Sequence, residues 1–472
     1  MLSVRSTCLP AHWPLALALS MLLCGASRAA PGCDDPPPKP PAATTEAPPA
    51  PTPEEALNQL AALAREAVAQ SADVRGAQHG SRAARFDLVQ TAAAARPGVG
   101  LSGGLGLSRT QYDGDARSES RAASLALSVS APIYDGGRLG ELVRYRQRMA
   151  DAGEISVGSV RERVVRDAVV TALERNRYTA QLAVHDRYVG KMACLVRMME
   201  QVVELDRGRS SELVQARKGL RQAQLAREDA LTAQRQAETR LQQLVGGPAI
   251  LPWSAVGQPL QALPPLAQVI DEIAASPDVR QLRLQAEAMD AYARASRAET
   301  SPQVRWQVGA SQARAARFDT ANWNAGLTLN LTLADGGAAT AGSNAAAERA
   351  LAARRQEDAL VEERVRTATT LHDTARSART RAVQIVDVLK ESEQVRAATY
   401  EQWARLGRRS LFDLMSAESE HVQLRLAEVN AQHDAWSAVA QLRSAGAGLW
   451  PWLAEAVSAS SPDQAGSTDV RK

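Results

Sequence analysis

The sequence predicts an α+β membrane protein with an internal duplication of a β-hairpin followed by a long helical hairpin. Residues 99–107 and 123–130 alternate apolar with small or polar side chains, as a strand does when its two faces meet different media. Residues 304–310 and 325–333 repeat this alternation. A long proline-free stretch rich in Ala, Leu, Arg, Glu and Gln follows each hairpin, which favours helix.

The duplication holds its register along much of the chain. Asp73 of the first half matches Asp278 of the second at an offset of 205 residues (278 minus 73). After the first hairpin the offset is 200 (335 minus 135), so the hairpin loops differ in length while the strands match. The motifs that leave each hairpin correspond at this second offset: Asp135-Gly136-Gly137 and Asp335-Gly336-Gly337.

The N-terminal residues predict export. Residues 1–29 have a basic residue, an apolar run too short for a permanent membrane helix, and Ser27-Arg28-Ala29 as a small-x-small cleavage site, which is typical of a signal peptide. Residues 30–53 hold ten of the twenty-three prolines and are interpreted as an extended linker.

The cysteines do not predict a disulfide framework. Cys8 and Cys24 would leave with the signal peptide, and Cys33 and Cys194 remain. Gly32 is the small residue that lipoprotein processing favours before the modified cysteine, so a lipid anchor on Cys33 and an inert thiol both stay open.

The remaining chain divides into two repeats. The first covers residues 54–248, with a helix, a β-hairpin over 98–131 and a long helical hairpin. An equatorial linker over 249–265 leads to the second repeat, 266–448, whose β-hairpin is predicted over 303–334, and 449–472 is a tail. A continuous helix from Arg138 to Asp206 would be about 100 Å long, more than the diameter of a globular domain.

The strands predict a sheet with two different faces. Each is about as long as a tilted transmembrane β-strand, and four strands leave edges that lipid forbids, so several chains must close a barrel. A half-buried soluble sheet would show the same alternation and stays open as an alternative. The expected lumen face carries Ser102, Ser128, Gln303, Arg305, Gln307, Asn324, Thr328 and Asn330; the expected lipid face carries Leu101, Leu105, Leu125, Leu127, Trp306, Leu327, Leu329 and Leu331.

Charge and motif content argue against nucleic-acid binding and catalysis. The formal net charge is +3, from 55 basic and 52 acidic residues, so no polybasic surface is indicated. The six histidines have no metal-ligand spacing, and no Ser or Cys lies in a nucleophile motif. No cofactor, metal or catalytic residue is predicted.

With these features in place, residues 54–452 resemble the TolC-like outer-membrane factor family. The resemblance rests on an Arg-Pro before the first strand, the string from Ala131 to Arg138 after the second, and Tyr400 to Ala417 with Gly407, Ser410, Asp413 and Leu414. It implies a homotrimer with a 12-stranded barrel, four strands per chain, continued by a helical tunnel across the periplasm. It also implies docking to an inner-membrane pump, of ABC or RND type, through a periplasmic adaptor.

The resemblance also narrows the function to a channel of a tripartite export system. The string from Asp206 to Ala216 looks like members that serve type I secretion of large adhesins. Drug or metal efflux by the same family is the alternative, and a soluble periplasmic coiled-coil adaptor or scaffold is an alternative of another class.

Three sets of site residues follow. Glycine and charge at breaks between long helices predict a periplasmic tip that docks the adaptor: Asp206, Arg207, Gly208, Arg209, Arg405, Leu406, Gly407, Arg408 and Ser410. One turn inside it we expect a gate of ion pairs formed by Glu212, Arg409 and Asp413. The family's second acid falls here on Ser416, which argues against a strong cation-selective ring. The bend between barrel and tunnel is predicted at Asp135, Gly136, Gly137, Asp335, Gly336 and Gly337.

Overall fold

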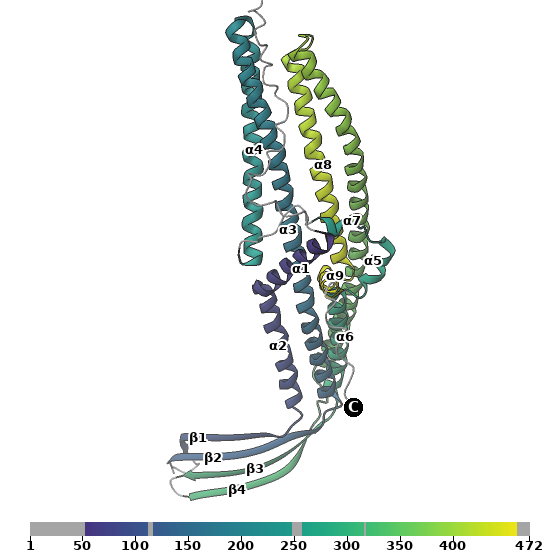
Figure 1. Cartoon of the computed structure of the whole chain (residues 1–472). Helices are drawn as coiled ribbons and strands as arrows, with labels where there is room; N and C mark the ends of the chain where they lie inside the picture. Colours follow the sequence, from purple (N-terminus) through teal and green to yellow (C-terminus); the bar gives the residue numbers. More distant parts are fainter. Residues whose placement is uncertain (1–51, 112–116, 248–256, 316–317, 460–472) are drawn as a thin grey trace, which may run out of the picture.

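The computed structural model describes residues 52–111, 117–247, 257–315 and 318–459. The predicted signal peptide, Cys33 and nearly all of the Pro-rich linker lie outside the described residues. The molecule is elongated, with a β-sheet at one end and the turns of two helical hairpins at the other (Figure 1).

The sheet contains four antiparallel strands in the order β1-β2-β3-β4. Their bounds are β1 Gly98–Gln111, β2 Arg117–Tyr134, β3 Gln303–Ala315 and β4 Phe318–Asn330. Backbone pairing extends to Gln111 and Arg117 in the first hairpin and to Ala315 and Phe318 in the second, past the segments in which apolar and polar residues alternate. The second hairpin ends at Asn330 and not at residue 334, since Asn330 pairs with Gln303, the first residue of β3.

The strand register confirms that the expected apolar residues within the strands share one face. Leu101 lies opposite Leu127, Leu127 opposite Ala310, and Ala310 opposite Trp323. Directly paired residues point to the same side of a sheet. The expected polar residues therefore share the other face, where Ser128 lies between Gly100 and Gly309.

Two helices run from the sheet to the opposite end of the molecule (Figure 1). They are α3 Arg138–Leu205, with 68 residues, and α7 Ala338–Ala404, with 67. At the usual rise each is about 100 Å long, as predicted for the first of them. Near the far end each packs along a shorter antiparallel partner, α4 Ser210–Val245 or α8 Leu411–Ala445.

The remaining helices surround the lower and middle parts of α3 and α7. Their bounds are α1 Pro53–Gln70, α2 Ala72–Ala93, α5 Leu266–Ile273, α6 Pro277–Arg297 and α9 Leu449–Ala459, with the short 3₁₀ helices η1 Arg207–Arg209, η3 Gln258–Leu260 and η4 Ala298–Thr300. α2 packs on α3, and α6 packs on both α3 and α7. Among the described residues, no helix has a stretch that is both long enough and apolar enough to cross a membrane.

Alanine side chains make up much of the buried surface between the helices, which agrees with an aromatic content of only 4%. α6 is an example, since its buried residues are a valine and five alanines: Val279, Ala286, Ala288, Ala291, Ala293 and Ala295. Small side chains let helix axes approach closely over a long contact. The long helices are thus held together along their length by many small contacts.

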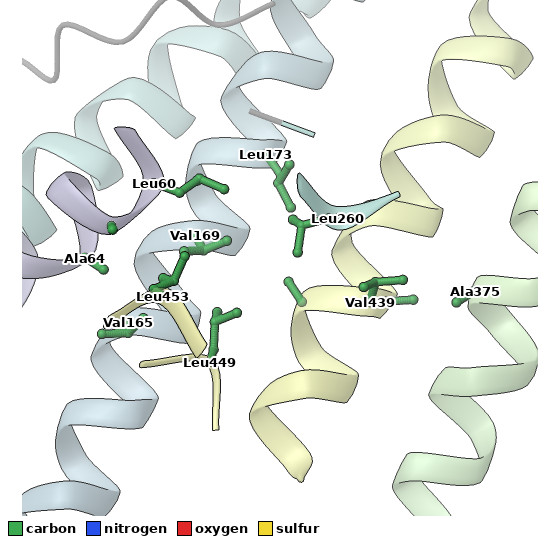
Figure 2. Packing of buried hydrophobic residues seen from close by; sticks show 13 residues of the cluster. Leu60, Ala64, Val165, Val169, Leu173, Leu260, Ala375, Val439, Leu449 and Leu453 are labelled. Carbon is green, nitrogen blue, oxygen red and sulfur yellow. The ribbon is translucent and has the colours of Figure 1, made fainter. Parts of the chain in front are cut away.

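The main hydrophobic core lies at mid-length, where α1, α3, α8 and α9 meet (Figure 2). Leu260 of the expected linker and Leu449 and Leu453 of the expected tail are buried in it. Glu162 of α3 accepts hydrogen bonds from the backbone N–H groups of Leu449 (2.6 Å) and Trp450 (3.0 Å) at the start of α9. The chain from residue 449 therefore begins as a docked helix, because its leucines complete the core and a carboxylate satisfies its first N–H groups.

Candidate functional site

The first helical hairpin turns over four residues between Leu205 and Ser210. Asp206 accepts a hydrogen bond from the backbone N–H of Gly208 at 2.9 Å, which closes the turn. Arg209 donates to both carboxylate oxygens of Glu212, at 2.9 and 2.7 Å. This hydrogen bonding to Glu212 raises the pKa of Arg209. The bidentate pair fixes the first turn of α4.

The second helical hairpin turns between Ala404 and Leu411. Gly407 has φ +61°, a conformation that glycine adopts readily, and the backbone N–H of Arg408 donates to the carbonyl of Gln402 at 3.0 Å. Ser410 and Asp413 form a reciprocal capping box at the start of α8. The backbone N–H of Ser410 donates to Asp413 at 3.1 Å, which, with the serine hydroxyl, lowers the pKa of the Asp413 carboxyl.

The two turns lie at the same end of the molecule, far from the sheet (Figure 1). The residues expected at the tip thus lie in two turns at one end of the molecule. Within one chain it forms only part of the expected gate. Glu212 is paired with Arg209, whereas Asp413 caps a helix and Arg409 donates to Gln402 Oε1 at 3.1 Å. Within its own chain, the Asp413 carboxylate accepts from the backbone N–H of Ser410 at 3.1 Å and from the Ser410 hydroxyl at 2.9 Å.

The two Asp-Gly-Gly motifs lie where strand gives way to helix. Asp135 accepts hydrogen bonds from the backbone N–H groups of Gly137 (3.0 Å) and Leu139 (2.6 Å). Asp335 does the same with the N–H groups two and four residues on, at 2.9 and 2.7 Å, and these bonds lower its pKa. All four glycines have positive φ: Gly136 69°, Gly137 82°, Gly336 68° and Gly337 90°. Each motif combines a left-handed bend with a capped start of a long helix.

The two motifs provide a matched test of the bend. Gly136→Ala would place a Cβ 2.3 Å from Ser301 Cβ, whereas a Cβ at Gly336 meets nothing within 4 Å. Both substitutions force a left-handed alanine, at about 1–3 kcal/mol each. We expect Gly136→Ala to destabilise more, measured as heat-induced loss of helical circular dichroism of the detergent-solubilised protein. Equal losses would mean that Ser301 does not constrain the first bend.

Sequence reasoning missed a buried charge network where α3, α7 and α8 meet. Lys191 Nζ lies 3.2 Å from Glu418 Oε2, and the two side chains are 9% and 6% exposed. Arg396 reaches the other oxygen of Glu418 at 3.3 Å and also pairs with Glu393. His421 Nε2 lies 3.5 Å from Glu393. The network joins the first helical hairpin to the second.

A signal for this network was present in the sequence. The buried stripe of α8 follows helical spacing and includes Leu411, Leu414, Glu418 and His421. The last two of these residues are polar. Polar side chains on an apolar stripe indicate buried partners. The partner Lys191 could not be found in this way, because it lies in the other half of the duplication.

No cluster of three or more His, Cys, Asp or Glu side chains able to hold a metal occurs in the described part of the chain. The arrangement instead consists of a two-faced sheet, two bends and two tips connected by long helices.

Comparison with known proteins supports this arrangement. The family model "Outer membrane efflux protein" matches residues 63–247. No curated protein matches the sequence.

Solved structures share the fold along most of the chain. CusC superposes with a TM-score of 0.74 at 18% identity, covering 83% of this chain and 92% of CusC. VceC from Vibrio cholerae gives 0.69 at 16% identity, covering 83% and 97%. The CmeC outer membrane channel of Campylobacter jejuni gives 0.72 at 14% identity, covering 84% and 86%.

Proposed function

We propose that this chain belongs to the outer membrane efflux protein family, whose model matches residues 63–247, and that it is the outer-membrane channel of a tripartite export system. It would assemble as a homotrimer with a 12-stranded barrel and act with a periplasmic adaptor and an inner-membrane pump. The observation that carries the proposal is the placement of a two-faced sheet and a pair of tips at opposite ends of helices about 100 Å long.

The exposed apolar face supports membrane insertion of the sheet. Leu105, Leu327 and Leu329 are 91%, 71% and 64% exposed in the single chain. Such a surface is stable in lipid and is an association hazard in water. Strands β1 and β4 form the two edges of the sheet, and further copies of the chain would pair with them and close the barrel.

The tips would face the adaptor. A photo-crosslinking amino acid at Arg207 or at Leu406, which is 55% exposed, should capture the adaptor in intact cells. The control position is Leu333, 88% exposed and next to the sheet. Capture from Leu333 alone would reverse the proposed orientation, and recovery of the chain outside the outer-membrane fraction would favour the soluble scaffold.

The cargo proposal rests on the turn from Asp206 to Ala216, which favours type I secretion of a large adhesin. Small-molecule efflux is the alternative within the family. Deleting the chain should remove the adhesin from the cell surface and leave drug accumulation unchanged. The reverse result would assign it to efflux.

We also propose that three copies bring Glu212 and Asp413 into a ring of up to six carboxylates at the closed tip. The lowered pKa of Asp413 keeps it ionised at neutral pH, and its helix cap is lost only as the pH falls through that lowered value. Arg209 already neutralises Glu212 within each chain. A pair within one chain is present in both the open and the closed state, so a bias would come from pairs between neighbouring copies. Each exposed pair of this kind is worth ~0–1 kcal/mol, and threefold repetition would be enough to bias opening.

Replacing Glu212 and Asp413 together by alanine should therefore raise single-channel conductance and reduce its dependence on salt. The exposed Glu204, just before the same tip, provides the control substitution Glu204→Ala. If the double variant formed trimers at normal levels and its conductance and salt dependence matched the wild type, the gate proposal would be wrong. Both carboxylates would then be ordinary solvated charges on the helix surface.

A further inference from the structure

The apolar face of the sheet changes character at its hairpin-loop end. Among the described side chains on this face, the charged ones are Arg121, Arg314 and Asp319, and all three lie at that end. The opposite end has only apolar residues on this face, such as Val129 and Val304. Charge therefore begins where the apolar band stops, at the end away from the helices (Figure 1).

The two arginines border a hollow with an apolar floor. Its volume is about 840 Å³, and it is lined by Leu105, Gly106, Leu107, Arg121, Ala122, Ala123 and Arg314. The register places Arg314 opposite Ala123, two residues from Arg121 on the same strand. Arg121 and Arg314 are thus diagonal neighbours, with backbones roughly 7–8 Å apart.

Asp319 orients one of these guanidinium groups. It lies opposite Arg314 in the register and accepts from Arg314 Nε at 3.1 Å. Arg314 nevertheless remains 72% exposed. The described rim thus keeps one net positive charge, and two guanidinium groups stand at one end of a leucine-lined floor.

We propose that this hollow binds an anionic, phosphate-bearing lipid of the outer leaflet, an inference that rests on the proposed membrane placement of the sheet. The phosphate would lie between Arg121 and Arg314, because guanidinium groups match phosphate oxygens in bidentate geometry. An acyl chain would cover Leu105 and Leu107.

Two features favour a lipid over free phosphate. The floor of the hollow is continuous with the exposed leucines on the apolar face of the sheet, such as Leu101. One lipid molecule can therefore contact the arginines with its phosphate and the leucines with its acyl chain. Trp323 lies on the same face and is 81% exposed, so it extends the apolar surface that an acyl chain could cover. Inorganic phosphate would use the arginines and leave the floor in water.

The test uses the full-chain protein extracted from outer membranes and mixed with detergent micelles that contain bis-phosphorylated lipid A or its dephosphorylated form. The variant is Arg121→Gln with Arg314→Gln. The control is Arg305→Gln, which removes an arginine from the opposite face of β3. Bound lipid per trimer is measured by native mass spectrometry, with trimer integrity followed by heat-modifiable electrophoresis.

Wild type and control should prefer the phosphorylated lipid, and the double variant should bind it about tenfold more weakly, as expected for the loss of charged hydrogen bonds. The variant Arg121→Lys with Arg314→Lys keeps both positive charges and should keep part of the preference for the phosphorylated lipid. If it did so while the glutamine variant lost the preference, misfolding caused by substitution at these positions would not explain the loss. Equal binding by the wild type and the double variant, or displacement by equimolar inorganic phosphate, would overturn the lipid site while leaving the channel proposal intact. Absence of the wild type from outer membranes would overturn both.

Discussion

Leu127→Arg should abolish most outer-membrane assembly, whereas Ser128→Arg, one residue along, should be tolerated. Leu127 lies at the centre of the apolar row on β2, opposite Leu101 and Ala310. An arginine at the lipid midplane costs about 2–4 kcal/mol per chain, and a closed trimer repeats that cost three times. Ser128 lies between Gly100 and Gly309 on the other face of the sheet, where an arginine would not meet lipid in the proposed barrel.

The measurement is the fraction of each variant recovered as heat-modifiable trimer in outer-membrane vesicles. If both variants assembled equally poorly, the two faces would be equivalent and the sheet would not separate lipid from lumen. If both assembled well, the strands would not cross the membrane.

Glu418→Leu should destabilise the helical body by about 3–5 kcal/mol, because it removes the shared partner of two cations from a buried network. Lys191 and Arg396 approach opposite oxygens of this carboxylate, and its side chain is 6% exposed. Glu420→Leu is the control, since Glu420 is exposed on the same helix and such changes stay within about 0.5 kcal/mol.

Urea-induced loss of helical circular dichroism in detergent provides the measurement. Adding Lys191→Met to Glu418→Leu should recover part of the loss, because one buried cation no longer lacks its carboxylate. A double variant as unstable as the sum of the two single variants would mean that the pair is not coupled.

The sequence predicted those features that repeat at short range. Period-two alternation identified all four strands and their faces, and the absence of proline predicted the length of α3. Ser410 and Asp413 stand in the spacing of a capping box, so the start of α8 could also be read locally.

Features that depend on distant partners were missed. The end of β4 is set by where β3 begins, and α9 is ordered by Glu162, which lies 287 residues before Leu449. Glu418 lies on the apolar stripe of α8 and is buried, whereas Glu420 lies off the stripe and is exposed, but the stripe alone does not identify the cations that pair with Glu418. Those pairings are tertiary contacts that local spacing describes only in part.

Because α3 is long and unbroken, we expect it to move as one rigid rod. The helix has one continuous ladder of backbone hydrogen bonds from Arg138 to Leu205 and no proline, so it has no joint of its own. A pivot for the whole helix would lie at the left-handed Gly136-Gly137 bend beside the sheet. A tilt of about 5° at that pivot displaces the far end of a rod about 100 Å long by about 9 Å. In the proposed trimer, a small rotation at the sheet and a large displacement at the tip would therefore be the same motion.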